Sequence, residues 1–297
     1  MASSDITRGR PGRHAKTPVA PAPLVSLQTF TIRKDLKKAC RGGSLLREAR
    51  LFRLMEDIRK KGYRHLELAR APFDPEIWED IGRAAAKAEI SIESTQIKLR
   101  EIEADLGKTI EMHRSLPCRR VVISVLPLRL AGAGAAAYHE FAGRLNRLGE
   151  KLRDSGLELL FHHHHFEFLP LKDEKTKTGM DILIKCLDPH LVKLVLDTYW
   201  LQRGGENPGS FIRRIGGMGL AGGVHLRDYA LTLKFTAIKA SDTCVGKGRL
   251  DFTDIYHACN EARVAYMAVE QDSGLPWEDI SAAYSHMKSI IYNTRGI

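Results

Sequence analysis

Eight short apolar runs alternate with longer segments of helical periodicity, and this alternation constrains the fold more than any other feature of the chain. Short apolar or β-branched runs bounded by turn residues indicate buried strands, whereas apolar residues spaced three and four apart indicate helices with one buried face. We expect strands at residues 25–30, 63–68, 90–97, 119–126, 157–163, 191–196, 222–226 and 265–269. Helical patterns fall between most of them, including 44–61, 76–89, 103–116, 138–155 and 251–263.

Eight strand–helix units between residues 24 and 297 match a (β/α)₈ barrel, which typically takes about 250 residues. An open, doubly wound sheet is the main alternative. No GxGxxG or P-loop motif opens any of the expected helices, which weakens that alternative. We therefore predict an α/β fold, a TIM barrel, forming a single domain over residues 24–297.

Residues 1–23 have a different composition from the rest of the chain. They contain Arg8, Arg10, Arg13 and Lys16 against one acidic residue, and end in a run rich in proline and alanine. No apolar core of a secretory signal is present. We expect a disordered basic tail here, with an organelle transit peptide as the alternative because the stretch is rich in arginine and poor in acids.

Net charge indicates which binding partners the chain favours, and the cysteine pattern indicates its redox environment. The 46 Lys and Arg against 36 Asp and Glu give a net charge of +10, which favours anionic partners such as nucleic acids, phosphorylated metabolites or acidic sugars. The five cysteines are scattered without a C-x-x-C pair, so we expect a reducing, cytoplasmic environment rather than a disulfide or zinc-finger scaffold. No apolar run approaches the roughly 20 residues of a membrane helix, and no membrane partner is expected.

Polar side chains gather at the carboxyl ends of the last four expected strands, the face that forms the active site in such barrels. Asp197, His225 and Glu270 end the sixth, seventh and eighth strands, while the run HHHHFEF, with His162 first and Glu167 sixth, ends the fifth. Each alone has a structural explanation, such as a helix cap or a buried hydrogen-bonded histidine. Together they indicate an open site for Mn²⁺, Mg²⁺, Co²⁺ or Zn²⁺.

Alternation along a strand places His162 and His164 on one side and the other two histidines on the opposite side. The inward pair is therefore a candidate for acid–base catalysis, metal ligation or binding of sugar hydroxyls. The basic residues near the expected mouth could hold a phosphate or carboxylate, or form a solvated rim. The residues that we expect to bind substrate are Gln28, Glu67, Gln96, Lys98, Arg227 and Lys247.

Five segments, 162–168, 196–200, 225–228, 245–252 and 269–272, together resemble the sugar phosphate isomerase/epimerase superfamily, the xylose-isomerase-like barrels. The resemblance covers roughly residues 24–290. It implies one divalent metal, with Mn²⁺ the expected ion, held by Glu, Asp, His and Glu on strands five to eight. Asp197, His225 and Glu270 match that pattern. Where epimerases of the family have the first glutamate this chain has His162, so we take Glu167 as the fourth ligand and His162 as the alternative.

The resemblance implies a metal-dependent isomerase or epimerase that acts on a small-molecule sugar or keto-sugar. Glu270, His162 or His164 would remove a proton alpha to a carbonyl, and the metal would stabilise the enediolate. A lyase like the inosose dehydratases, which would dehydrate or deglycosylate a 3-keto sugar, shares this first step and is the main alternative.

Two further alternatives rank lower. Endonuclease IV relatives share the barrel and a basic surface, but they need a histidine shortly after the strand-six aspartate, where this chain has Trp200. That difference argues against a nucleic-acid substrate. A non-catalytic sugar-binding barrel is the other alternative. The sequence leaves open whether the chain forms a homo-oligomer.

Overall fold

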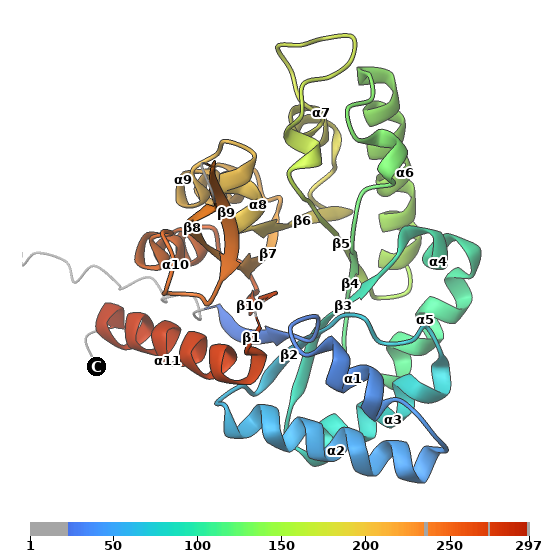
Figure 1. Ribbon diagram of the computed structural model, residues 1–297. Coiled ribbons are helices and arrows are strands. Elements are labelled where there is room, and N and C mark those ends of the chain that lie inside the picture. Colours follow the sequence, from blue (N-terminus) through green and yellow to red (C-terminus); the bar gives the residue numbers. More distant parts are fainter. Residues whose placement is uncertain (1–22, 235–236, 273, 296–297) are drawn as a thin grey trace, which may run out of the picture.

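Eight parallel strands close into a barrel in the order β1-β10-β7-β6-β5-β4-β3-β2, with the helices around the outside (Figure 1). This computed structural model describes residues 23–234, 237–272 and 274–295, so the expected N-terminal tail lies outside the described residues except for Pro23. The TIM barrel prediction is confirmed. The barrel strands are β1 (Leu24–Gln28), β2 (His65–Leu68), β3 (Ser91–Ile97), β4 (Arg120–Ile123), β5 (Glu158–His162), β6 (Val192–Asp197), β7 (Ala221–Leu226) and β10 (Tyr266–Val269).

Several helices begin at a side chain that caps them. Asp74 and Asn207, for example, accept hydrogen bonds from the backbone N–H groups of Ile77 and Ser210. None of the helices in the described part of the chain is long and apolar enough to cross a bilayer. The helices are α1 (Arg33–Ala39), α2 (Ser44–Lys60), α3 (Pro75–Lys87), α4 (Leu99–Ala104), α5 (Leu106–Ser115), α6 (Ala135–Arg153), α7 (Gly179–Cys186), α8 (Thr198–Arg203), α9 (Pro208–Gly217), α10 (Phe252–Glu261) and α11 (Pro276–Arg295).

The helix expected over residues 103–116 is confirmed as α5 over residues 106–115, but its first residues belong to α4, and the two helices are separated by a break at Asp105. The backbone of Asp105 leaves the helical conformation, and its side chain accepts a hydrogen bond from the N–H of Lys108. An aspartate favours such a cap over an interior helix position, because its carboxylate satisfies a backbone N–H that would otherwise lack a partner.

A ladder of charges crosses the amino ends of five neighbouring strands. Glu93 pairs with His65 (3.0 Å) and with Arg120 (3.5 Å). Glu158 pairs with Arg120 (3.3 Å) and with Lys193 (2.8 Å). Two surface cavities of about 460 and 720 Å³ lie at this end of the barrel, with Glu158 in the wall of both. Polar residues at the amino ends of barrel strands serve stability, whereas catalytic residues gather at the carboxyl ends.

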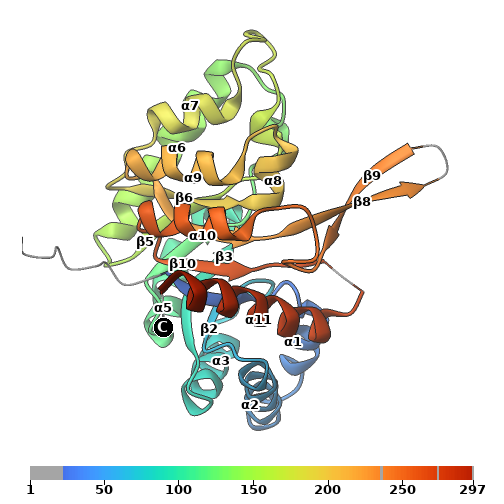
Figure 2. The same ribbon diagram turned by 90° about the vertical axis from the view of Figure 1, so that its left-hand side faces the viewer.

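A two-stranded antiparallel hairpin follows β7 and is not among the expected elements. It pairs β8 (Asp228–Lys234) with β9 (Ala237–Thr243), from Asp228 opposite Thr243 to Lys234 opposite Ala237. Figure 2 shows the hairpin projecting away from the barrel. Its base continues directly from the carboxyl end of β7, so residues near the base can reach the strand ends.

Candidate metal centre

The pleat of the strands explains which side chains meet inside the barrel. Val122, Leu160, Val195, Tyr266 and Ala268 form a small apolar cluster of fully buried residues, separate from the main core between strands and helices. Residues two positions further along a strand face the same side, one layer nearer the carboxyl end. On β5, β6 and β10 that layer is polar, and the pairing of β6 with β7 sets His225 beside Asp197. The layer contains His162, Asp197, His225 and Glu270.

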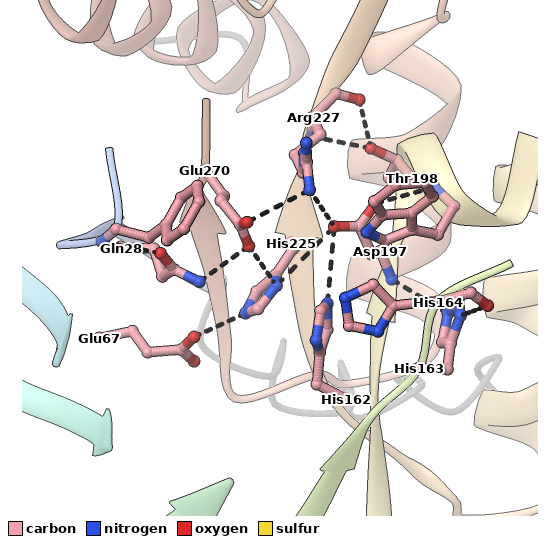
Figure 3. Close-up of polar contacts among 12 residues, drawn as sticks. Gln28, Glu67, His162, His163, His164, Asp197, Thr198, His225, Arg227 and Glu270 are labelled. Atoms are coloured by element: carbon pink, nitrogen blue, oxygen red, sulfur yellow. Dashed lines mark hydrogen bonds and ion pairs between the residues drawn. The ribbon is translucent and has the colours of Figure 1, made fainter. Parts of the chain in front are cut away.

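These four buried residues each offer one ligand atom, and the four atoms lie within 4.8 Å of one another. His162 Nε2 lies 3.6 Å from Asp197 Oδ2, and His225 Nδ1 lies 3.0 Å from Glu270 Oε2 (Figure 3). His162 Nε2, Asp197 Oδ2 and His225 Nδ1 make no hydrogen bond of regular geometry in the described structure, and their short contacts are the ion pairs with one another and with Glu270. Buried polar atoms without partners are costly, so three of them directed at one point fit a bound divalent cation.

Both imidazoles are fixed in an orientation that suits ligation. His162 Nδ1 lies 3.1 Å from the carbonyl oxygen of Ser124, and His225 Nε2 lies 2.7 Å from Glu67 Oε1. A carbonyl or carboxylate oxygen only accepts, so the outward nitrogen donates its proton, and the inward nitrogen faces the centre, where it offers a lone pair whenever the ring is neutral. Histidines that bind metals usually have such an acceptor behind them.

Glu67 is buried beside His225 and accepts several hydrogen bonds. Besides His225, it accepts from Ser94 Oγ (2.7 Å), Gln96 Nε2 (3.0 Å) and Tyr266 Oη (2.6 Å). Burial opposes ionisation, but the charge of His225 and these donors lower the pKa of Glu67 below its usual value. Glu67 is therefore an ionised carboxylate that orients His225, and the substrate-binding role expected for Glu67 and Gln96 gains no support from these contacts.

Replacing Glu67 with Gln should weaken divalent-metal binding by about 10–100-fold, the usual cost of losing the acceptor behind a ligating histidine. The new amide would present a donor to a site that already holds four donors, so His225 should lose its fixed orientation. Isothermal titration with Zn²⁺ and Mn²⁺ measures the change, with circular dichroism to check folding. Ser94→Ala is the matched control, since it removes one hydrogen bond to Glu67 without touching His225. Equal affinities in wild type and Glu67→Gln would contradict this role.

Glu270 is held on both of its oxygens. Gln28 Nε2 donates to Oε2 (2.8 Å), and Arg227 Nη1 lies 3.2 Å from Oε1. The pKa of Glu270 is lowered, because Arg227 and His225 outweigh the cost of burial. Burial likewise disfavours the charged form of His225, yet Glu67 and Glu270 raise its pKa to about 10. The carboxylates around His225 thus favour a positive charge at its position, while Arg227 offsets part of the negative charge of Asp197 and Glu270.

His164 lies at the edge of this centre without belonging to its ligand set. Its ring centroid lies 4.7 Å from that of His162 and 5.3 Å from that of Trp200. Burial, with the neighbouring His162, holds the pKa of His164 far below its usual value, so the ring is neutral. Its Nδ1 and the Nε1 of Trp200 have no partner among the described residues. Both are buried polar atoms that a hydrogen bond from a bound ligand would satisfy.

Three of the expected site residues lie elsewhere. Glu167 Oε2 accepts a hydrogen bond from the backbone N–H of His164 (2.9 Å), and Glu167 is not one of the four converging side chains. Lys98 pairs with Glu101 at the start of α4 (3.4 Å), and Lys247 pairs with Asp279 on α11 (3.6 Å). The strand ends at His162, and the chain then turns into a short 3₁₀ helix that directs Glu167 away. The structure therefore favours His162 over Glu167 as the fourth ligand.

Glu167 should make stability fall as the pH rises. Burial raises its pKa to about 8, so between pH 4.5 and 8 the unfolded chain ionises while the folded protein keeps the proton. That difference lowers the free energy of unfolding by up to about 1.4 kcal/mol per pH unit. Glu167→Gln should remove this slope, so urea denaturation from pH 5 to 8 should show a smaller decline than in wild type. Parallel curves for the two proteins would contradict the assignment.

Asp242 belongs to the site but was not predicted from the sequence. It lies on β9, and its Oδ2 accepts hydrogen bonds from Arg227 Nε (3.1 Å) and Nη2 (2.5 Å). Arg227 also packs against the rings of Tyr199 and Trp200, 5.1 Å from each centroid. The alternating apolar and polar residues of 230–240 are a hairpin signal that could have revealed β8 and β9. No local pattern marks Asp242 itself.

The closed barrel, with imidazoles and carboxylates converging at its strand ends, places the chain among TIM barrels able to hold a divalent cation. Residues 55–290 match the model of the xylose isomerase-like TIM barrel family, and the chain belongs to that family. The resemblance found in the sequence is thereby confirmed.

Individual relatives are more distant. The inosose dehydratase of Clostridium beijerinckii is 27% identical over 163 residues, which cover 50% of this chain and 52% of that protein. The match thus spans about half of this curated relative. A sugar phosphate isomerase/epimerase structure from Parabacteroides distasonis has a TM-score of 0.70 at 18% identity, covering 94% of this chain and 98% of that one. The IolI protein, solved with a zinc atom, has a TM-score of 0.62 at 16% identity, covering 91% and 98%.

Proposed function

We propose that this protein is a divalent-metal-dependent enzyme that removes a proton alpha to the carbonyl of a sugar or keto-sugar. An isomerase would return the proton to the neighbouring carbon, and an epimerase would return it to the opposite face of the same carbon. The observation that supports this function is the convergence of four buried ligand atoms, three of them without partners, at the catalytic end of a TIM barrel. Family membership supports the substrate class.

His162, Asp197, His225 and Glu270 would hold the metal. When bound, a divalent ion supplies the Lewis acidity that polarises a carbonyl and stabilises the negative charge that develops on its oxygen. A base removes the proton from the adjacent carbon, and the electron pair of the broken C–H bond moves into an enediolate of the substrate. Glu270 is one candidate base, because it is ionised and its two oxygens are fixed.

His164 is the second group for proton transfer. It is neutral, its Nδ1 is free, and its ring lies beside that of His162. The low pKa makes this ring a weak base in the free protein, so it would accept a proton only beside a negative charge that develops on the substrate and raises that pKa. Gln28 and Arg227 orient Glu270, and the Nε1–H of Trp200, which has no partner among the described residues, is a candidate donor to a substrate oxygen.

A lyase reaction is the second candidate, favoured by two observations. Position 162 is a histidine, so this site has one carboxylate fewer than the two-glutamate epimerases that the sequence resembles. Elimination needs one base for the C–H bond and one acid for the departing hydroxyl, whereas epimerisation needs groups on both faces of one carbon. The relative from Clostridium beijerinckii is an inosose dehydratase, which fits this alternative.

Proton exchange in D₂O tests the step that both candidates share. The metal-loaded protein is incubated with a ketohexose, a keto-cyclitol and a 3-keto-glucoside, and ¹H NMR follows the signal of the carbon-bound proton next to the carbonyl. We expect that signal to disappear for one of these classes. An epimer or isomer as product identifies the first candidate, and an unsaturated ketone identifies the second. Absence of exchange in all three classes, with metal bound, would overturn the proposed function.

A further inference from the structure

The candidate metal centre has more imidazole ligands than the ligand set that the sequence resemblance implies. Two of the four converging atoms are imidazole nitrogens, His162 Nε2 and His225 Nδ1, and two are carboxylate oxygens. The resemblance implies three carboxylates and one imidazole. His162 is the last residue of β5, at the position that the resemblance gives to the first glutamate.

The surroundings of His162 fix its side chain in the metal centre. Its side chain is buried, and β5 pairs with β6 in a register that sets His162 opposite Val195, two residues before Asp197. The carbonyl of Ser124 at the end of β4 accepts from Nδ1 and thereby fixes the tautomer with a lone pair on Nε2. Nothing else in the described chain binds that lone pair.

Ligand type decides which divalent ion such a site favours. Carboxylate and water oxygens suit Mg²⁺ and Mn²⁺, whereas imidazole nitrogens suit Zn²⁺ and the later transition ions. A second imidazole also removes one negative charge from the ligand set, and the hard ions depend most on that charge. Three of the six separations among the four atoms, 3.0, 3.6 and 3.9 Å, lie near the roughly 3.3 Å edge of a tetrahedron with Zn-like bonds, and all six are within 4.8 Å.

We infer that His162 determines the ion selectivity of this site and shifts it from Mn²⁺ towards Zn²⁺, an inference that rests on the proposed metal centre. Nearly every site of nitrogen and oxygen ligands binds Zn²⁺ more tightly than Mn²⁺, so the informative quantity is the ratio of the two dissociation constants. The Mn²⁺ dissociation constant divided by the Zn²⁺ dissociation constant should be larger in this chain than in a variant with glutamate at position 162. The inference departs from the Mn²⁺ expected from the sequence.

The experiment measures Zn²⁺ and Mn²⁺ dissociation constants by competition titration with chelators, in wild type, His162→Glu and the control His165→Gln. His165 stacks on Trp200 outside the ligand set. We expect the Mn²⁺ to Zn²⁺ ratio to fall at least tenfold in His162→Glu and to stay unchanged in the control. A ratio that is the same in all three proteins would overturn the inference and leave the proposed function standing. Wild type that binds neither ion would overturn both.

A second measurement keeps the inference testable if His162→Glu does not fold. In protein labelled with ¹⁵N-histidine, the Nε2 resonance of His162 should shift when Zn²⁺ is added to the wild type, because this nitrogen becomes a ligand. His162→Gln, which has no imidazole, identifies the resonance by its absence and should lose Zn²⁺ affinity by a larger factor than Mn²⁺ affinity. An Nε2 resonance that Zn²⁺ leaves unmoved while other histidines respond would overturn the inference.

Discussion

Glu270→Gln should lower turnover by about 10³-fold and should also weaken metal binding. Glu270 contributes both a ligand atom and a candidate base, and loss of a positioned base alone costs about 10²–10⁴-fold. Glutamine has nearly the same shape, so Gln28 and Arg227 can still contact it and the barrel should remain folded. Deuterium exchange on the responsive keto-sugar gives the rate, and elemental analysis of dialysed protein gives the metal content.

The matched control for Glu270 is Glu261→Gln on α10. Glu261 is exposed and pairs with Arg213, so the same chemical change there should leave turnover and metal content within about twofold. If Glu270→Gln retains wild-type turnover, or if wild type turns over substrate with no metal present, the metal-dependent mechanism is wrong. If both variants lose activity alike, the effect of Glu270→Gln is not specific to the centre.

The barrel could be predicted from the sequence because its signals are local and repeated. Each strand is a short apolar run, and residues such as Leu160, Val195 and Ala268 occupy alternate positions that only a pleated strand brings to one side. Asp197, His225 and Glu270 could also be predicted, because a polar residue at the end of an apolar strand marks the catalytic face of this fold. Their convergence follows from topology, without knowledge of any loop.

The fourth ligand could not be chosen from the sequence, because the choice depends on where β5 ends. The strand stops at His162, which therefore faces the barrel interior, and the 3₁₀ turn that follows directs Glu167 away from the centre. The hairpin and Asp242 were missed for a related reason. Arg227 and Asp242 are 15 residues apart in the chain and meet only because β8 and β9 fold back on each other. No short-range sequence pattern predicts that contact.

Asp228, the first residue of the hairpin, holds the loop before α10 through hydrogen bonds. These contacts explain two of the segments on which the family resemblance depends, 225–228 and 245–252. The side chain of Asp228 is buried, and it accepts hydrogen bonds from five backbone N–H groups. A Cβ atom at Gly248 would lie 2.2 Å from Asp228 Oδ1, and Gly246 has a φ of +85°, so the glycines allow the loop to wrap the carboxylate. The donors are the N–H groups of Tyr229, Gly246, Gly248, Arg249 and Leu250.

Asp228→Asn should therefore be the most destabilising polar substitution at this end of the barrel, lowering the free energy of unfolding by about 3–5 kcal/mol. An asparagine replaces one accepting oxygen with an NH₂ group, which would face backbone donors and leave two or three of them buried without a partner. Thermal unfolding should show a decrease in Tm on the order of 10 °C for a chain of this size. Asp57→Asn, at an exposed pair with Lys60 on α2, should shift stability by no more than about 0.5 kcal/mol. Similar small losses in both variants would mean that solvent satisfies the loop N–H groups and that Asp228 does not hold the loop.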